Sequence, residues 1–415
     1  MTDDTLTGTT EPARDARWPL AVTIIGLGIT QIMGYGTLYY AFAVLEPQIS
    51  REFGWPSSWS FGCLSLALLL GGLAGPWAGR LIDERGARLV MALGSVASAI
   101  ALVLLALSQN LVTFALALII VEVTSVLVLY DAAFAGLSQA AGSKAARRAI
   151  TQMTLLGGFA STVFWPITLY LTQHMDWRSI YLIFAGIHVV FCLPLHLLVL
   201  VKARPSHVSE AAKRQEAEPD HPVLGPTEGF RAMVWLIAYF CLTGFVYSSF
   251  NIQWVSALQQ AGFTAAVAVS VGVLMGPSQV AIRFLDMIFG RNLHPLVTGA
   301  ISSAFLVVAL AALLASADAG LAGAAIFAIL FGLSQGLSSI VRGTIPLVLF
   351  GRMGYGARLG RISAISVAVK SCAPFVFALL IENAGPVVAF GASGVLAVLS
   401  LLVLRFIPRP PQSHV

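Results

Sequence analysis

Twelve long apolar segments constrain this chain more than any other feature. A helix that crosses a bilayer core of about 30 Å needs about 20 mostly apolar residues. Hydrophobic residues make up 58% of the 415 residues and charged residues only 10%, which is too little charge for the surface of a soluble protein. The sequence therefore predicts an all-α membrane protein with twelve transmembrane helices, at residues 19–45, 58–80, 88–107, 111–138, 149–172, 178–202, 232–258, 264–289, 295–315, 320–348, 362–382 and 386–407.

Basic residues in the loops predict the orientation of these helices. With the N-terminus in the cytoplasm, Arg51 and Arg178 are the loop cations that fall outside, and the other loop cations fall inside. Cytoplasmic loops carry an excess of Lys and Arg. We therefore expect both termini in the cytoplasm and a multi-pass protein of the inner (plasma) membrane. The net charge of +5 follows from this topology, and no nucleic-acid partner is expected.

A polar segment rich in Pro and Glu, residues 203–231, interrupts the apolar pattern. We interpret it as a cytoplasmic linker. It separates two domains of six apolar segments each, residues 18–202 and 232–407, and cytoplasmic tails are expected at 1–17 and 408–415.

The two domains share an order of motifs. Gly75-Pro76 in the second segment is matched by Gly276-Pro277 in the eighth, and Trp165-Pro166 in the fifth by Ala373-Pro374 in the eleventh. Proline in a helix frees a carbonyl group, which neighbouring helices are expected to satisfy. Repeated six-helix units around a mid-membrane site are typical of secondary transporters, so the sequence predicts two pseudo-symmetric six-helix bundles.

The loop after the second segment reads Gly79-Arg-Leu-Ile-Asp83-Glu-Arg85-Gly86-Ala-Arg88. This pattern, G-x-x-x-D-x-x-G-x-R, resembles the motif between the second and third helices of the Major Facilitator Superfamily. The twelve segments and the central linker are also similar to that family. The resemblance implies a secondary transporter that works by alternating access. Asp83, Arg85, Gly86 and Arg88 are expected to latch the cytoplasmic side when the outer side is open; a solvated basic loop is the alternative.

Other functional classes lack support in the sequence. No nucleotide-binding or hydrolase motif is found, and the four cysteines show no metal spacing. We therefore expect a protein that is not an enzyme, needs no cofactor and no metal, and acts as a monomer in the lipid bilayer.

Two basic residues lie deep in apolar segments of the second domain, Arg283 in the eighth and Lys370 in the eleventh. A charge at membrane depth is costly, so such residues usually face a cavity or a partner. Their positions resemble those of the two cations of oxalate/formate antiporters and monocarboxylate transporters, although Lys370 lies about one helical turn deeper. A guanidinium and an ammonium together suit a carboxylate. Alternatively, Arg283 extends to the cytoplasmic side beside Asp286.

Three further charged residues suggest coupling and gating. Glu122 lies near mid-depth of the fourth segment, where a carboxyl group can carry a proton; a structural carboxylate bonded to a neighbouring Ser or Thr is the alternative. Asp131 in the fourth segment and Arg342 in the tenth occupy matching depths. We expect them to pair across the cavity and close the inner gate.

Polar side chains recur every four residues in two matched segments. Gln31, Tyr35 and Tyr39 lie on the first, and Thr243 and Tyr247 on the seventh. This spacing keeps them near one helix face, where they are expected to line an aqueous path and bind carboxylate oxygens. Hydrogen bonding between helices is the alternative.

These residues together predict a secondary active transporter for small organic anions, mono- or dicarboxylates, with protons as the candidate coupling ions. The alternative is a proton-coupled exporter of drugs or other xenobiotics, which Glu122 and Asp131 would serve. A membrane receptor built on a transporter fold is a third, less supported reading.

Overall fold

The computed structural model describes residues 20–200, 224–289, 293–350 and 355–408, apart from some side chains within these ranges, such as that of Asp83. The predicted N-terminal tail, most of the predicted linker and the end of the C-terminal tail lie outside them. The described residues form helices and no strands, which confirms the predicted fold class. The elements are α1 (Leu20–Tyr35), η1 (Gly36–Tyr40), α2 (Ala41–Phe53), α3 (Ser57–Arg85), α4 (Ala87–Ala106), α5 (Leu111–Ser125), α6 (Tyr130–Gly157), α7 (Ala160–Thr172), α8 (Trp177–Ile187), η2 (His188–Cys192), α9 (Leu193–Val199), α11 (Pro226–Gln260), α12 (Ala265–Gly272), α13 (Met275–Phe289), α14 (Pro295–Leu314), α15 (Ser316–Phe350), α16 (Tyr355–Ala384), α17 (Pro386–Val403) and η4 (Leu404–Phe406).

Within the described residues, 12 segments are long and apolar enough to cross a membrane, which confirms the predicted number. The fourth span joins α5 to the start of α6, and the eighth joins α12 to α13. The spans run over Leu20–Phe53, Ser57–Ile82, Ala87–Ala106, Leu111–Leu137, Ala149–Thr172, Trp177–Val199, Thr227–Gln260, Ala265–Asp286, Pro295–Leu314, Ala319–Phe350, Ala364–Ala384 and Pro386–Phe406.

Two spans begin or end away from their predicted bounds. The first continues past residue 45 to Phe53, because Glu46 is buried and its Oε1 accepts a hydrogen bond from Ser50 Oγ at 2.5 Å. A carboxyl group satisfied one turn along its own helix does not end that helix. Helix α11 begins at Pro226, inside the predicted linker, since proline suits the first turn of a helix.

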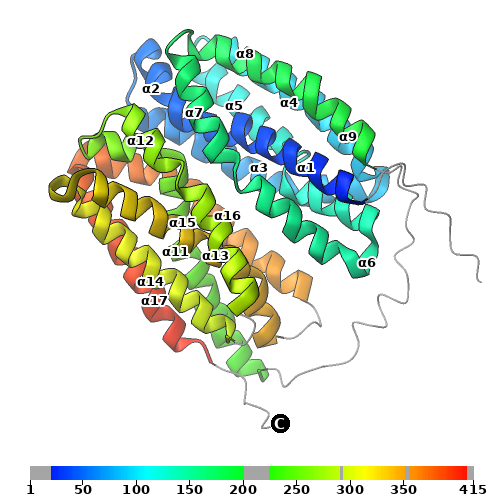
Figure 1. Ribbon diagram of the computed structural model, residues 1–415, viewed down its shortest axis with the longest axis vertical. Coiled ribbons are helices and arrows are strands. Elements are labelled where there is room, and N and C mark those ends of the chain that lie inside the picture. The colour runs from blue at the N-terminus through cyan, green and yellow to red at the C-terminus, as the bar shows by residue number, and fades with distance from the viewer. Residues whose placement is uncertain (1–19, 201–223, 290–292, 351–354, 409–415) are drawn as a thin grey trace, which may run out of the picture.

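Helices α1–α9 form one half of the molecule and helices α11–α17 the other (Figure 1). Across the boundary, α3 packs along α16, and α7 packs against α12 and α13. The halves meet at the end where α2 and α12 lie, and they diverge toward the end where α6 and the start of α16 lie (Figure 1).

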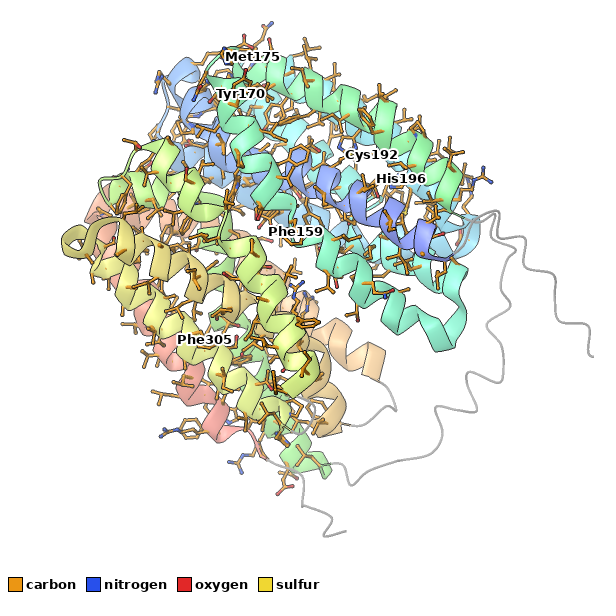
Figure 2. The ribbon with its side chains drawn as sticks, in the orientation of Figure 1. Phe159, Tyr170, Met175, Cys192, His196 and Phe305 are labelled. Carbon is orange, nitrogen blue, oxygen red and sulfur yellow. The ribbon has the colours of Figure 1, made fainter. Side chains whose placement is uncertain are left out.

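Side chains on the outside of the bundle are apolar, as a lipid-facing surface requires. Tyr170, 61% exposed, lies at the end of α7, and Phe305 lies on α14 (Figure 2). Many polar groups instead lie inside, where they find hydrogen-bond partners. His196 on α9 (Figure 2) is buried, and its Nδ1 lies 2.9 Å from Ser95 Oγ. This arrangement follows from lipid, which offers no hydrogen-bond partners.

Candidate functional site

A cavity of about 420 Å³ lies between the two halves. Most of its lining residues have polar side chains, although most of the lined surface is apolar. On each helix the lining residues follow the spacing i, i+3, i+4 and i+7 that defines one helix face. The lining residues are Tyr39 in η1; Leu68, Gly71 and Gly72 in α3; Glu122, Ser125 and Val126 at the end of α5; Gly244, Tyr247, Ser248 and Asn251 in α11; Gln335, Ser338, Ser339 and Arg342 in α15; and Val367, Lys370 and Ser371 in α16.

Lys370 contributes a cation to this cavity from the middle of α16. Among the described residues, no carboxylate lies within 4.0 Å of its ammonium group. Arg342 lines the same cavity and is close enough to Lys370 to repel it. The wall made by the second half therefore carries two cationic side chains.

The Lys370 side chain packs directly on the backbone of α11 at Gly244. A Cβ atom at Gly244 would lie 2.3 Å from Cε and 2.9 Å from Cγ of Lys370. These distances are shorter than any van der Waals contact, so the lysine lies where it does because position 244 has no side chain.

The backbone carbonyl of Lys370 is bonded by a serine of the neighbouring helix and not by its own helix. Pro374 has no N–H to donate to the carbonyl of Lys370, four residues earlier, and Ser248 Oγ donates to that carbonyl at 2.7 Å instead. Gln253, the non-helical residue within α11, donates through Nε2 to Pro374 O at 2.6 Å. This confirms for Lys370 that a neighbouring helix satisfies the carbonyl freed by a proline.

Glu122 supplies a carboxyl group from the first half. It is 6% exposed, lines the cavity, and its Oε1 has no hydrogen-bond partner. The carboxyl group interacts with the side chain of Ser125, whose hydroxyl also donates to Glu122 O at 2.8 Å. The cavity thus has an acid on one wall and cations on the other.

Of the predicted polar stripes, Tyr39 and Tyr247 line the cavity. The other three residues make contacts elsewhere. Gln31 Nε2 donates to Val128 O at 2.9 Å, Thr243 Oγ1 donates to Tyr239 O at 2.8 Å, and the ring centroid of Tyr35 lies 4.7 Å from that of Tyr130. Hydrogen bonding between helices, the stated alternative, describes Gln31, whereas Thr243 bonds within its own helix and Tyr35 makes a ring contact.

Arg283 is not among the residues that line the cavity with Lys370. Its Nη1 donates to Thr154 O of the first half at 3.4 Å, and its Nε has no partner. It also lies close enough to Tyr40 and Tyr130 to interact with them electrostatically. Among the described residues no acid lies within 4.0 Å of Arg283, Asp286 included. The two cations predicted to bind one substrate thus have different surroundings.

The predicted gate residues are apart in this conformation. Asp131 and Arg342 form no ion pair within 4.0 Å. In the loop after α3, Gly86 adopts a φ of 82°, as a tight turn requires. Arg85 is exposed and Arg88 is half-buried, while the side chain of Asp83 lies outside the described part of the structure.

Several contacts between the halves were not predicted from the sequence, and one of them joins the start of α3 to α16. Ser58 N, in the first turn of α3, donates to Glu382 Oε1 near the end of α16 at 2.7 Å. The N-cap of α3, Pro56, provides no side-chain cap, and a carboxylate from the other half takes that place. A helix start without a capping side chain was the available signal, but it does not identify the partner.

Comparison with known proteins places this geometry in context. The family model described as the Major Facilitator Superfamily matches residues 27–353, and no protein of curated function matches the sequence. Among solved structures, a bacterial homologue of the human lysosomal transporter Spinster, inward-facing and unoccupied, is 13% identical with a TM-score of 0.72, covering 97% of this chain and 100% of that one.

Two further solved structures are similar over nearly the whole chain. The human organic anion transporter MFSD10 (TETRAN) is 18% identical with a TM-score of 0.59, covering 95% of this chain and 100% of that one. A POT family transporter in complex with 5-aminolevulinic acid is 12% identical with a TM-score of 0.72, covering 93% and 95%. At these identities the similarity concerns the fold alone.

Proposed function

This chain belongs to the Major Facilitator Superfamily and is a secondary transporter of that type, and we propose that its substrates are small organic anions, mono- or dicarboxylates. The observation that carries the proposal is Lys370, an ammonium group in the central cavity with no described carboxylate within 4.0 Å. An anion would supply the missing counter-charge. Two structural neighbours, an organic anion transporter and a POT family transporter in complex with 5-aminolevulinic acid, are compatible with this class.

The size and polarity of the cavity support a small, polar substrate. Its volume of about 420 Å³ is at the lower end of the range found for small-molecule sites. Serines, amides and charged groups are frequent among its lining residues, which suits a substrate with charged or hydrogen-bonding groups. We attribute carboxylate binding to Lys370 with Tyr39 and Tyr247, and we retain Arg283 as a candidate for a second binding position along the path.

Alternating access gives the two halves their role. We propose the domain division at 18–202 and 232–407 and the orientation with both termini in the cytoplasm of the inner membrane. In that orientation, the end at which the halves diverge (Figure 1) faces the cytoplasm. The transporter would be open inward, and the bond between Ser58 and Glu382 would help to close the outer end.

A ligand screen on the purified protein tests the substrate class. We expect small carboxylates to raise its thermal unfolding temperature, and the hydrophobic cation tetraphenylphosphonium to leave it unchanged. Stabilisation by the cation alone would overturn the proposal and favour the exporter.

Gly244→Ala is expected to weaken carboxylate binding about tenfold, since the added methyl group displaces the Lys370 side chain at an overpacking cost of about 1 kcal/mol or more. Binding is measured by titration of the purified protein. Gly391→Ala is the matched control, because a Cβ there meets nothing within 4 Å. Equal binding by both variants would contradict the assigned position of Lys370.

The Asp131–Arg342 gate is tested by exchanging the charges. We expect Asp131→Arg and Arg342→Asp each to slow transport into proteoliposomes, and the double exchange to restore part of it. Residues that pair directly typically show a coupling of about 0.5–3 kcal/mol in such a cycle. Additive losses would exclude direct pairing in any state of the cycle.

Proton coupling through Glu122 predicts a distinct result. In wild-type proteoliposomes, substrate accumulation should follow an imposed pH gradient, and Glu122→Gln should make accumulation independent of it, because glutamine binds no proton in this range. If the variant keeps the wild-type dependence on pH, Glu122 is not the coupling residue.

A further inference from the structure

We propose that the carboxylate carried by this transporter also bears an ammonium group, so that the substrate is a small amino acid-like zwitterion held between Lys370 and Glu122. This inference rests on the proposed function and concerns the same cavity. It comes from the opposite chemistry of the two walls.

The wall made by the second half donates hydrogen bonds. Lys370 offers an ammonium group with no described carboxylate within 4.0 Å. The Oε1 atom of Gln335 accepts a hydrogen bond from Gln279 Nε2 at 2.6 Å, so the amide NH₂ group of Gln335 remains able to donate. Both residues line the cavity, so this wall suits a carboxylate.

The wall made by the first half accepts hydrogen bonds. Glu122 lines the cavity and is only 6% exposed, and its Oε1 has no hydrogen-bond partner. Ser125, beside it, donates to Glu122 O and also interacts with the carboxyl group, yet Oε1 stays without a partner. A buried acceptor without a donor is unfavourable, and an ammonium group is the strongest donor that a small substrate can bring to it.

Simpler anions leave this wall unsatisfied. A monocarboxylate bound at Lys370 has no donor for Glu122. A dicarboxylate adds a second negative charge, which Arg342 in the same cavity would offset, but it too brings no donor to Glu122. A molecule with a carboxylate at one end and an ammonium group at the other complements both walls.

A matched series of ligands tests this inference at one pH, so that proton coupling plays no part. The probes are straight-chain acids of three to five carbons, the same acids with a terminal amine, and the dicarboxylates of equal length. Titration of the wild-type protein should show that the best amino acid binds about tenfold or more tightly than its plain acid. The dicarboxylate should bind less tightly than that amino acid, because it brings no donor to Glu122.

Glu122→Gln should reduce that affinity ratio to near one, whatever its effect on the plain acid. Glu46→Gln is the control, since Glu46 is a buried acid of the same half that does not line the cavity, and it should keep the ratio. If Glu122→Gln does not fold, Glu122→Ala replaces it. A wild-type protein that binds the amino acid no more tightly than its plain acid overturns the zwitterion without any variant. Binding of plain acids without preference for the amine overturns the zwitterion while sparing the proposed function. Failure of every acid to bind overturns both.

Discussion

Lys370→Met is expected to lower the affinity for carboxylates about 100-fold, the largest effect that we expect from one substitution. Methionine has a similar length and can fill the space on Gly244, so the packing of α16 is largely kept. The change removes the ammonium group and with it a charge-assisted hydrogen bond at a site away from bulk water, where such bonds contribute about 1.5–3 kcal/mol.

Calorimetric titration of the purified variant measures this loss. Lys370→Arg keeps the positive charge and is expected to retain part of the affinity, although a guanidinium does not fit the same position. Wild-type affinity in Lys370→Met would remove the basis of the anion assignment, while leaving the transporter fold intact.

Gly276→Ala is expected to disfavour the present arrangement of the halves by about 1–3 kcal/mol. A Cβ at this position of α13 would lie 2.2 Å from Thr162 Oγ1 and 3.0 Å from Gly158 O, both in the first half. Thr162 Oγ1 already donates to Val273 O at 3.2 Å, so moving it also costs a hydrogen bond. The conflict exists only while the halves are packed in this way, so the population should shift toward other states.

Gly75→Ala is the matched control for this substitution. Gly75 precedes Pro76 as Gly276 precedes Pro277, yet a Cβ at Gly75 meets nothing within 4 Å. Distances between spin labels on the diverging ends of the halves report the population. We expect shorter distances with Gly276→Ala and the wild-type distribution with Gly75→Ala. Identical distributions in the two variants would show that this contact does not bias the equilibrium.

Much of the site lay beyond sequence reasoning because helix rotation is not encoded locally. Thr243 and Tyr247 are four residues apart, and four residues of a helix with 3.6 residues per turn rotate by about 40° more than a full turn. Thr243 therefore does not share the helix face that Tyr247 presents to the cavity. The cavity is lined by Gly244, Tyr247 and Ser248 instead, which follow the true period.

Glycine was also hard to recognise as part of a site. Gly244 has no side chain. Its role is visible only in the folded protein, where Lys370, more than a hundred positions later in the chain, packs against it. Arg283 and Lys370 were both predicted to bind the substrate, because each is a cation in an apolar segment. In the folded protein Arg283 donates to Thr154 O and does not line the cavity that Lys370 lines.

The sequence alone determined the fold class, the number of spans and the residue types at membrane depth, since lipid imposes length and apolarity on every crossing helix separately. The tertiary structure decided which face of each helix lines the cavity, which carbonyl Ser248 satisfies beside Pro374, and which cation stays without a carboxylate nearby. Those outcomes depend on how helices from distant parts of the chain rotate and pack against each other, and no local pattern records that.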